Sequence, residues 1–241
     1  MRALAEYDGA GYLGFQVQRD APTVQGVLEQ ALQRLTGQAT RIRYAGRTDA
    51  GVHASGQVIA AQVRWRHSLN DLERAWNAVL PADVAVRDLK LTDDPSFHPR
   101  YSAQSRVYRY TVWTEPQRSP LHRRYAHHEP RPLDVAAMNQ AASILVGSHD
   151  FASFGQPTQG EVTVRRVDSA VWWQDGPLLT FEIEANAFLR RMVRTIVATL
   201  LEVGNGRRSV ADVSATLAAR ERSKAAPPAP ACGLCLVAVK Y

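Results

Sequence analysis

Hydrophobic and polar residues in the first hundred positions follow the two periods expected of strands and helices. Apolar residues recur at i, i+3, i+4 and i+7 after Thr23 and after Ser68, two residues whose hydroxyls can cap a helix. Gly37 and Pro81 would end these two helices. Strand patterns cover four short stretches, residues 2–7, 41–45, 57–65 and 84–91. The predicted order is β-α-β-β-α-β, the split βαβ arrangement of ferredoxin-like and RNA-binding domains.

The rest of the chain has the same order of predicted elements, without a visible residue-level repeat. It begins with a strand over 103–114 and a Pro- and His-rich surface excursion over 116–132. There follow a helix that Asp134 caps and Gly147 ends, and two strands over 161–174 and 178–185 around an Asp175–Gly176 turn. The last elements are a helix over 187–203, a short helix that Ser209 caps, and a strand after the Pro-rich segment 226–230.

These two patterns predict an α+β fold. We expect two pseudo-symmetric RRM-like or ferredoxin-like (βαββαβ) halves with antiparallel sheets, an N-terminal half over residues 1–100 and a C-terminal half over residues 101–241. A ligand would bind in a central cleft between two such halves.

The composition is that of a folded protein. With 241 residues, of which 45% are hydrophobic and 22% charged, the chain is unlike disordered, collagen or coiled-coil proteins. No apolar run reaches about eighteen residues, so we expect no membrane-spanning helix. Glu6 interrupts the apolar stretch that a secretory signal would need, and we therefore expect a cytoplasmic protein.

Arginine dominates the basic residues. The formal net charge is +6, and 26 of the 29 basic residues are Arg, with only three Lys. Because the guanidinium is planar, permanently charged and suited to phosphates and bases, this composition favours a nucleic-acid partner. Codon usage in a GC-rich or thermophilic source would explain the same excess of Arg without any ligand.

The two cysteines, Cys232 and Cys235, have the C-x-x-C spacing of redox and metal sites. A structural zinc needs four ligands, and no second Cys or His pair of suitable spacing completes the set. The residues that follow are apolar and favour a buried strand. We therefore predict a structural role for this segment and no metal site.

The densest polar segment lies between two predicted strands, in a loop over residues 46–56. It combines three glycines with Arg47, Asp49 and His53. Glycines permit backbone shapes and close approaches that other residues forbid, which is typical of a loop that meets a ligand. An ordinary turn, in which Asp49 caps the backbone and pairs with Arg47, would use the same residues.

Residues 46–53, with the sequence Gly-Arg-Thr-Asp-Ala-Gly-Val-His, resemble the signature of the TruA family of tRNA pseudouridine synthases. Further segments resemble that family in the same order, with Phe15 where the family usually has Trp: residues 6–9 and 14–18, 97–103 and 106–110, 150–154, 185–194 and 233–241. The resemblance therefore extends over the whole chain.

The resemblance implies an isomerase that converts uridine to pseudouridine in the anticodon arm of tRNA, at positions 38, 39 and 40. It also implies two RNA-binding-like halves around a basic cleft, a homodimer, and no cofactor or metal. The reaction breaks the C1′–N1 bond, turns the uracil and rejoins it through C5, so that nothing is oxidised and no group leaves.

The resemblance also assigns roles to single residues. Asp49 corresponds to the family's nucleophile, and Arg194 to the cation that keeps this carboxylate ionised. Tyr108 corresponds to the aromatic residue against the target base, whereas Tyr110 on the same strand face is expected to pack in the core.

The remaining candidates are substrate-binding residues. Arg47 could fill the gap that a flipped base leaves. His53 and Gln57 could contact RNA or could equally fasten the loop. Cations expected at phosphates, chosen by charge, are Arg100, Arg106, Arg109, Arg190 and Arg191.

Two other functions use the same features. A catalytically silent RNA-binding module is disfavoured because an acid in a basic loop would weaken phosphate binding, and because the strands lack an RNP-type aromatic pattern. A nucleoside or glycoside hydrolase would need a second carboxylate to protonate the leaving group, and the loop over 46–53 offers only Asp49.

Overall fold

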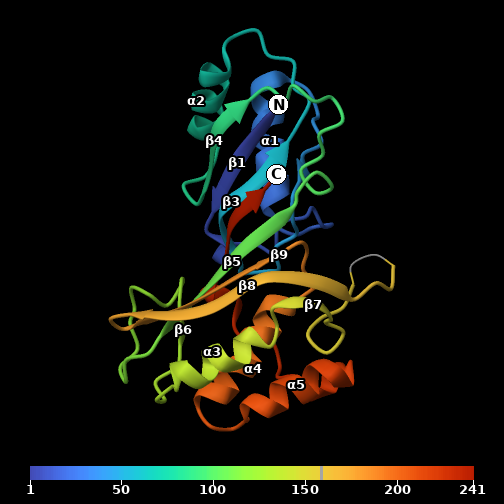
Figure 1. Ribbon diagram of the computed structural model, residues 1–241. Helices are drawn as coiled ribbons and strands as arrows, with labels where there is room; N and C mark the ends of the chain where they lie inside the picture. Colours follow the sequence, from blue (N-terminus) through green and yellow to red (C-terminus); the bar gives the residue numbers. More distant parts are fainter. Residues whose placement is uncertain (158–159) are drawn as a thin grey trace. The chain divides into compact units, whose positions relative to one another are not determined.

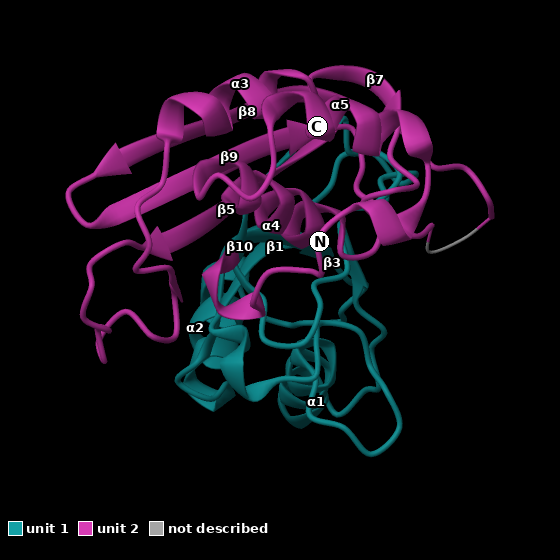
Figure 2. Cartoon of the chain, turned by 90° about the horizontal axis from the view of Figure 1, so that it is seen from below, with its two compact units in different colours: residues 1–104, 235–241 teal, residues 105–234 magenta. Residues whose placement is uncertain are grey.

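A computed structural model describes residues 1–157 and 160–241, which form two compact units (Figure 1). Unit 1 consists of residues 1–104 and 235–241, and unit 2 of residues 105–234 (Figure 2). We predicted halves over 1–100 and 101–241, and the units differ from these mainly because residues 235–241 belong to unit 1. The mixed α+β class is confirmed, and the pseudo-symmetry of the halves stays a prediction.

Unit 1 has a sheet in which β1 lies between β3 and β4 and is antiparallel to both. The short β2 pairs antiparallel with β3, and β10 pairs parallel with β3, with Cys235 opposite His53. The elements are β1 (Arg2–Tyr7), the 3-10 turn η1 (Gly9–Gly11), α1 (Val24–Thr36), β2 (Arg43–Tyr44), β3 (His53–Ala60), α2 (Leu69–Val79), β4 (Val84–Lys90) and β10 (Leu234–Lys240).

Local chemistry determines where the two helices of unit 1 begin and end. The Thr23 hydroxyl accepts a hydrogen bond from Gly26 N (3.3 Å), and Gly37 ends α1 in the left-handed region. The Ser68 hydroxyl caps α2 through Asp71 N (3.1 Å). These predictions are confirmed, and the apolar faces of the helices are fully buried at Leu28, Leu32, Leu72 and Trp76.

The prediction for β3 is wrong at both ends. The strand begins at His53 rather than at Gln57, and it ends at Ala60 rather than at Trp65. Residues 53 and 54 enter the strand because β10 pairs with them. A Cβ atom at Gly56 would lie 2.1 Å from Val237 O, so only glycine allows the two backbones to approach this closely.

Unit 2 has a sheet of order β5-β9-β8-β7 with antiparallel neighbours, and α3, α4 and α5 lie together on one face of it (Figure 1). The elements are β5 (Ser105–Trp113), β6 (His127–His128), α3 (Val135–Ser143), β7 (Gly147–Asp150), β8 (Val164–Asp175), β9 (Leu178–Ala185), α4 (Met192–Gly204), α5 (Val210–Ala219), and the 3-10 turns η2 (Arg222–Lys224) and η3 (Ala231–Gly233).

Two predictions in unit 2 need correction. The long helix begins at Met192 rather than at residue 187, because residues 186–191 form a loop that ends in a left-handed Arg191 (φ 64°). The preceding helix ends at Ser143, and Gly147 begins β7, a strand that the sequence pattern did not indicate. The Asp175–Gly176 hairpin and the Ser209 cap of α5 are confirmed.

Within the described residues, the structure contains no helix of the length and apolar character that crossing a membrane requires. The surface excursion over 116–132 contains β6 and is otherwise without a regular element in the part described.

Candidate active site

The loop between β2 and β3 carries Asp49, whose side chain is half-buried, between the buried Thr48 and the exposed Ala50. Backbone hydrogen bonds hold the loop on both sides of this residue. Phe15 N donates to Thr48 O (3.1 Å), and Gly51 N donates to Tyr12 O (3.2 Å). Gly51 has φ 76°, in the left-handed region, so the turn after Asp49 favours glycine.

Side chains from the neighbouring strands also hold this loop. The Tyr7 hydroxyl lies 2.8 Å from the Thr48 hydroxyl in a buried position. Gln57 Nε2 donates to Gly46 O (2.6 Å), and its Oε1 accepts from Gly46 N (3.2 Å). Both ends of the Gln57 amide therefore bind one residue of the loop.

His53 and Gln57 are buried, with 5% and 0% of their surface exposed. His53 Nδ1 accepts a hydrogen bond from Gly9 N (3.0 Å) and lies 3.1 Å from Asp8 Oδ1. These contacts support the alternative in which both residues fasten the loop.

Arg47 differs from its neighbours in the loop because its side chain is exposed. Its Nε donates to the Tyr44 hydroxyl over 3.4 Å, a long contact within unit 1. An exposed guanidinium two residues before Asp49 is in a position to meet a ligand.

In unit 2, Arg106 and Tyr108 share a face of β5, and both are 8% exposed. Arg106 donates to Asn186 O (2.7 Å), and the Tyr108 ring contacts the Phe188 ring edge-on, with centroids 5.1 Å apart. The loop over 186–191 therefore lies against these two side chains. The sequence analysis did not select Phe188 as a neighbour of Tyr108, although Phe188 lies within the matched segment 185–194.

Arg190 and Arg191 are exposed at the end of this loop. Arg190 N donates to Gln156 O (2.8 Å), and Gln156 N donates back to Arg190 O (3.4 Å), so a short bridge holds the backbone while the side chains face solvent. This placement is compatible with the predicted phosphate contacts, which stay predictions.

Arg194 is half-buried in the first turn of α4. Its Nε donates to Ala229 O (2.6 Å), and Ala229 N donates to Arg194 O (3.0 Å). The guanidinium is thus held in one direction by residues that precede β10.

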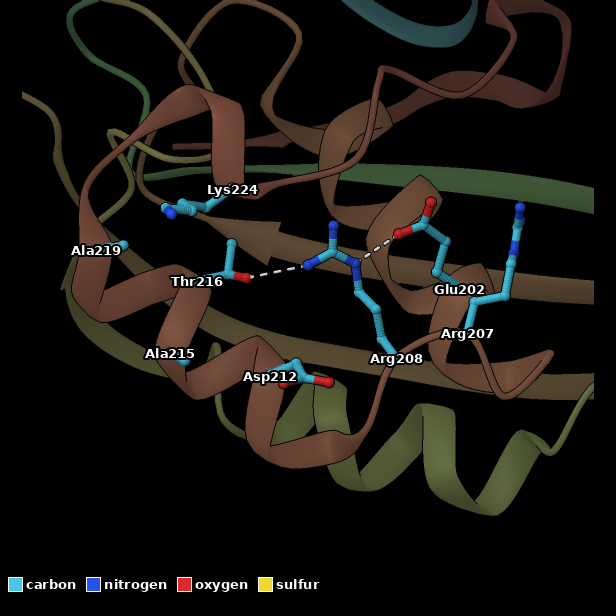
Figure 3. Close-up of a pocket in the computed structure, with 8 residues that line it drawn as sticks. All are labelled: Glu202, Arg207, Arg208, Asp212, Ala215, Thr216, Ala219 and Lys224. Atoms are coloured by element: carbon cyan, nitrogen blue, oxygen red, sulfur yellow. Dashed lines mark hydrogen bonds and ion pairs between the residues drawn. The ribbon is translucent and has the colours of Figure 1, made fainter.

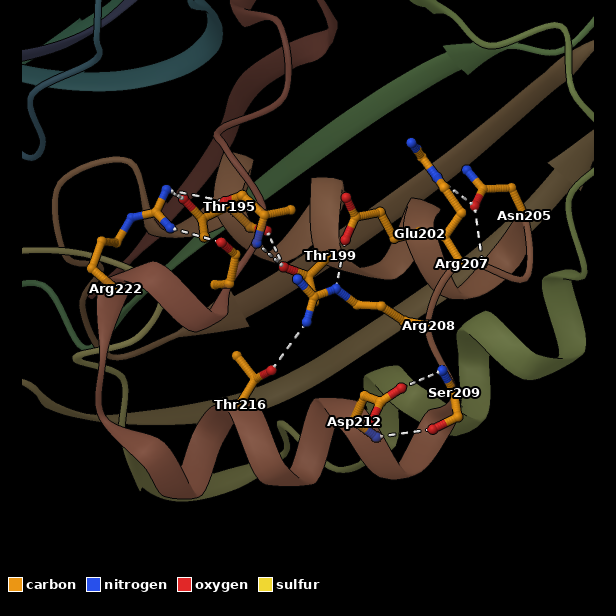
Figure 4. A network of polar contacts seen from close by, with 12 residues as sticks. Thr195, Thr199, Glu202, Asn205, Arg207, Arg208, Ser209, Asp212, Thr216 and Arg222 are labelled. Carbon is orange, nitrogen blue, oxygen red and sulfur yellow. Dashed lines mark hydrogen bonds and ion pairs between the residues drawn. The ribbon is translucent and has the colours of Figure 1, made fainter.

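A polar network fastens the segment that binds Arg194 (Figure 4). Thr195 and Thr199 on α4 are fully buried. Arg222 donates to the Thr195 hydroxyl (3.3 Å), and Ala226 N donates to the Thr199 hydroxyl (3.2 Å). Because buried polar groups need partners, these bonds hold residues 222–229 against α4.

Tyr110 behaves as a core residue. It is fully buried, and its hydroxyl donates to Pro230 O (2.9 Å). Burial raises the pKa of Tyr110 well above its ordinary value, so the hydroxyl stays protonated. The prediction that Tyr110 packs in the core is confirmed.

Comparison with known proteins gives the family. The family model described as tRNA pseudouridine synthase matches residues 3–102 and 141–241. The tRNA pseudouridine synthase A of Moorella thermoacetica is 47% identical over 240 residues, which cover 98% of this chain and 96% of that protein. The tRNA pseudouridine synthase A of Geobacillus kaustophilus is 44% identical over 243 residues, which cover 100% of this chain and 94% of that protein.

The chain belongs to the tRNA pseudouridine synthase family. It is therefore an isomerase that converts uridine to pseudouridine, and the resemblance drawn from the loop over 46–53 is confirmed. Within this family member, the predicted site residues fall into two groups. Arg47, Asp49, His53 and Gln57 lie in unit 1, and Arg106, Tyr108, Arg190, Arg191 and Arg194 lie in unit 2.

A cavity of about 530 Å³ lies in unit 2 (Figure 3). Arg208 crosses it, with Nε donating to Glu202 (2.5 Å) and a second nitrogen to the Thr216 hydroxyl (3.4 Å). Its described lining consists of Glu202, Arg207, Arg208, Asp212, Ala215, Thr216, Ala219 and Lys224. No predicted site residue is in this set.

The two cysteines of this synthase are reduced thiols, Cys232 in η3 and Cys235 in β10. Cys235 Sγ lies 3.9 Å from the Ser55 hydroxyl on the neighbouring β3. Across residues 1–157 and 160–241, no three His, Cys, Asp or Glu side chains are grouped as metal ligands would be.

Proposed function

We propose that this enzyme modifies uridines in the anticodon arm of tRNA, at positions 38, 39 and 40, with Asp49 as the nucleophile. The observation that carries the proposal is the arrangement of the loop over 46–53. Gln57 binds its backbone at Gly46 and Tyr7 binds the side chain of Thr48, while Asp49 itself is half-buried. A carboxylate fixed in this way can meet a reacting ribose or base in one orientation.

The reaction needs a carboxylate that is ionised although it is partly removed from water. Burial disfavours the charged form of an acid unless a cation is close. We assign this role to Arg194, following the family resemblance. Its hydrogen bond to Ala229 fixes the direction of the guanidinium and supports a role that depends on orientation.

The target uridine must leave the stacked arm to be reached, which costs a few kcal/mol. We assign Arg47 to the gap that the flipped base leaves, because its side chain is exposed beside Asp49. The exposed Arg190 and Arg191 would bind phosphates and position the arm. Arg106 is buried and donates a hydrogen bond to Asn186 O, which supports a role in holding the loop over 186–191.

A homodimer is part of the proposal and follows from the resemblance. Sedimentation at micromolar concentration should show a species of twice the chain mass of 26.7 kDa. A species of the single mass alone would contradict it.

The choice of substrate positions can be tested by mapping. The wild-type enzyme is incubated with a transcribed tRNA that has uridine at 38, 39 and 40, and with versions in which each is replaced by cytidine. We expect pseudouridine, detected by carbodiimide labelling and primer extension, at these positions and its loss wherever cytidine stands. Pseudouridine formed only outside the anticodon arm would contradict the proposed specificity while leaving the family activity intact.

Tyr108 and Tyr110 make a matched pair for testing the role of the ring against the base. Tyr108→Phe should lower the single-turnover rate about 100-fold, because the hydroxyl is proposed to reach the proton on C5. Tyr110→Phe should lower the free energy of unfolding by about 1 kcal/mol, since it loses the bond to Pro230 O, and should leave the rate unchanged. Equal rates for the two variants would contradict the role of Tyr108.

A further inference from the structure

Gln57 and Tyr7 hold the two residues that lie on the strand side of Asp49. Gln57 is fully buried, and its amide forms two hydrogen bonds to the backbone of Gly46. Tyr7 is 3% exposed, and its hydroxyl bonds to Thr48, the residue immediately before Asp49. We propose that both are positioning residues, which fix the loop so that Asp49 is held ready for reaction.

The Gln57 amide replaces a strand partner that the sheet does not provide. The β2 ladder ends with Tyr44 opposite Ile59, and one more backbone bond joins Ala45 N to Val58 O (2.9 Å). Gly46 is the next residue, and its N–H and C=O bind the Gln57 side chain instead of a backbone. Buried or half-buried backbone groups need such partners, so this amide determines where the loop leaves the sheet.

The Tyr7 contact acts closer to the reacting group. Thr48 is buried and is held by two contacts. Its hydroxyl bonds to the Tyr7 hydroxyl, and its carbonyl oxygen accepts a hydrogen bond from Phe15 N. Asp49 follows it directly, and the Gly51 N bond to Tyr12 O fixes the other side. A shift of about 1 Å at Thr48 would move the carboxylate and can lower a rate about 100-fold.

A purely structural role would produce the same contacts, and two other residues of unit 1 provide controls for it. Gln25 is 1% exposed, and its amide also binds two backbone groups, Val17 N (3.0 Å) and Ile42 O (3.1 Å). Tyr12 is 7% exposed, and its hydroxyl donates to Asp83 (2.7 Å). Neither side chain binds the loop over 46–53 in these contacts. Tyr12 binds Gly51 N only through its backbone oxygen, which Tyr12→Phe leaves in place.

The test compares Gln57→Met with Gln25→Met, and Tyr7→Phe with Tyr12→Phe. Release of tritium from tRNA labelled at uracil C5 is measured in single turnover with saturating enzyme, together with the tRNA Kd and the urea midpoint. Gln57→Met and Tyr7→Phe should lower the saturating rate at least about 10-fold, with Kd changed less than about twofold. Gln25→Met and Tyr12→Phe should lower the urea midpoint but keep the rate within about twofold.

Equal saturating rates for the loop variants and their controls would overturn the proposal. A raised Kd with an unchanged saturating rate for Gln57→Met would also overturn it and would assign Gln57 to RNA binding. If Gln57→Met does not fold, the Tyr7→Phe and Tyr12→Phe pair decides, because losing one hydroxyl changes little else. The inference rests on the proposed role of Asp49, and Asp49→Asn in the same assay separates the two: an active Asp49→Asn variant contradicts the nucleophile, whatever the loop variants do.

Discussion

Replacing Asp49 by Asn should abolish the release of tritium from tRNA labelled at uracil C5, with a loss of at least about 10⁴-fold in the single-turnover rate. The neutral amide has nearly the same shape as the carboxylate but cannot act as a nucleophile. The loop should keep its structure, since Gly46 and Thr48 are held by Gln57 and Tyr7. Binding of tRNA should change little, because the substitution removes a negative charge and no cation.

Two controls make this result specific. Asp49→Ala excludes the slow return of an acid by deamidation of the new Asn, and Asp93→Asn changes an exposed acid of unit 1 without affecting the loop. The Kd for tRNA is measured by filter binding for every variant. Tritium release by Asp49→Ala above about 1% of the wild-type rate would contradict the nucleophile assignment.

Gly56→Ala should destabilise the protein strongly. A Cβ atom at this position would lie 2.1 Å from Val237 O and 2.7 Å from Val237 C, both of them backbone atoms that cannot move without opening the pairing of β3 with β10. We expect the free energy of unfolding to fall by about 3 kcal/mol or more.

Gly11→Ala is the matched control for this change. A Cβ atom at Gly11 would meet nothing within 4 Å, and the residue is exposed. Its free energy of unfolding should stay within about 0.5 kcal/mol of the wild-type value. Urea unfolding followed by circular dichroism measures both variants, and equal midpoints for the two would show that β3 and β10 do not approach as closely as described.

Helix starts could be predicted from the sequence wherever a neighbouring side chain determines them. Thr23, Ser68, Asp134 and Ser209 each cap the helix that follows, because the contact involves residues only a few positions apart. The predicted start of α4 was wrong because Arg106 holds the preceding loop at Asn186, which lies 80 positions away from it in the sequence. The start of β3 was wrong for the same reason, since its partner β10 is distant in sequence.

The residues of the candidate site also divide into those that the local sequence reveals and those whose contacts only the fold reveals. The loop with Asp49 could be identified because its eight residues are contiguous and resemble the signature of the family. From the sequence, Gln57 and His53 are candidates either for RNA contacts or for fastening the loop. Only the fold reveals that both are buried, with Gln57 hydrogen-bonded to Gly46 and His53 to Gly9. Spacing along a strand indicates which residues share a face, but it does not indicate what covers that face.

The pairing of β10 with β3 also bears on how the enzyme is made. Residues 105–234 separate β10 from the rest of unit 1, so a growing chain on the ribosome exposes the edge of β3 at His53 and Ala54 without its partner strand until residues 235–241 emerge. Open strand edges invite pairing with other chains, so this part of β3 is exposed to such pairing during that interval. Unit 1, with the loop that carries Asp49, is therefore completed only after all of unit 2 has been translated.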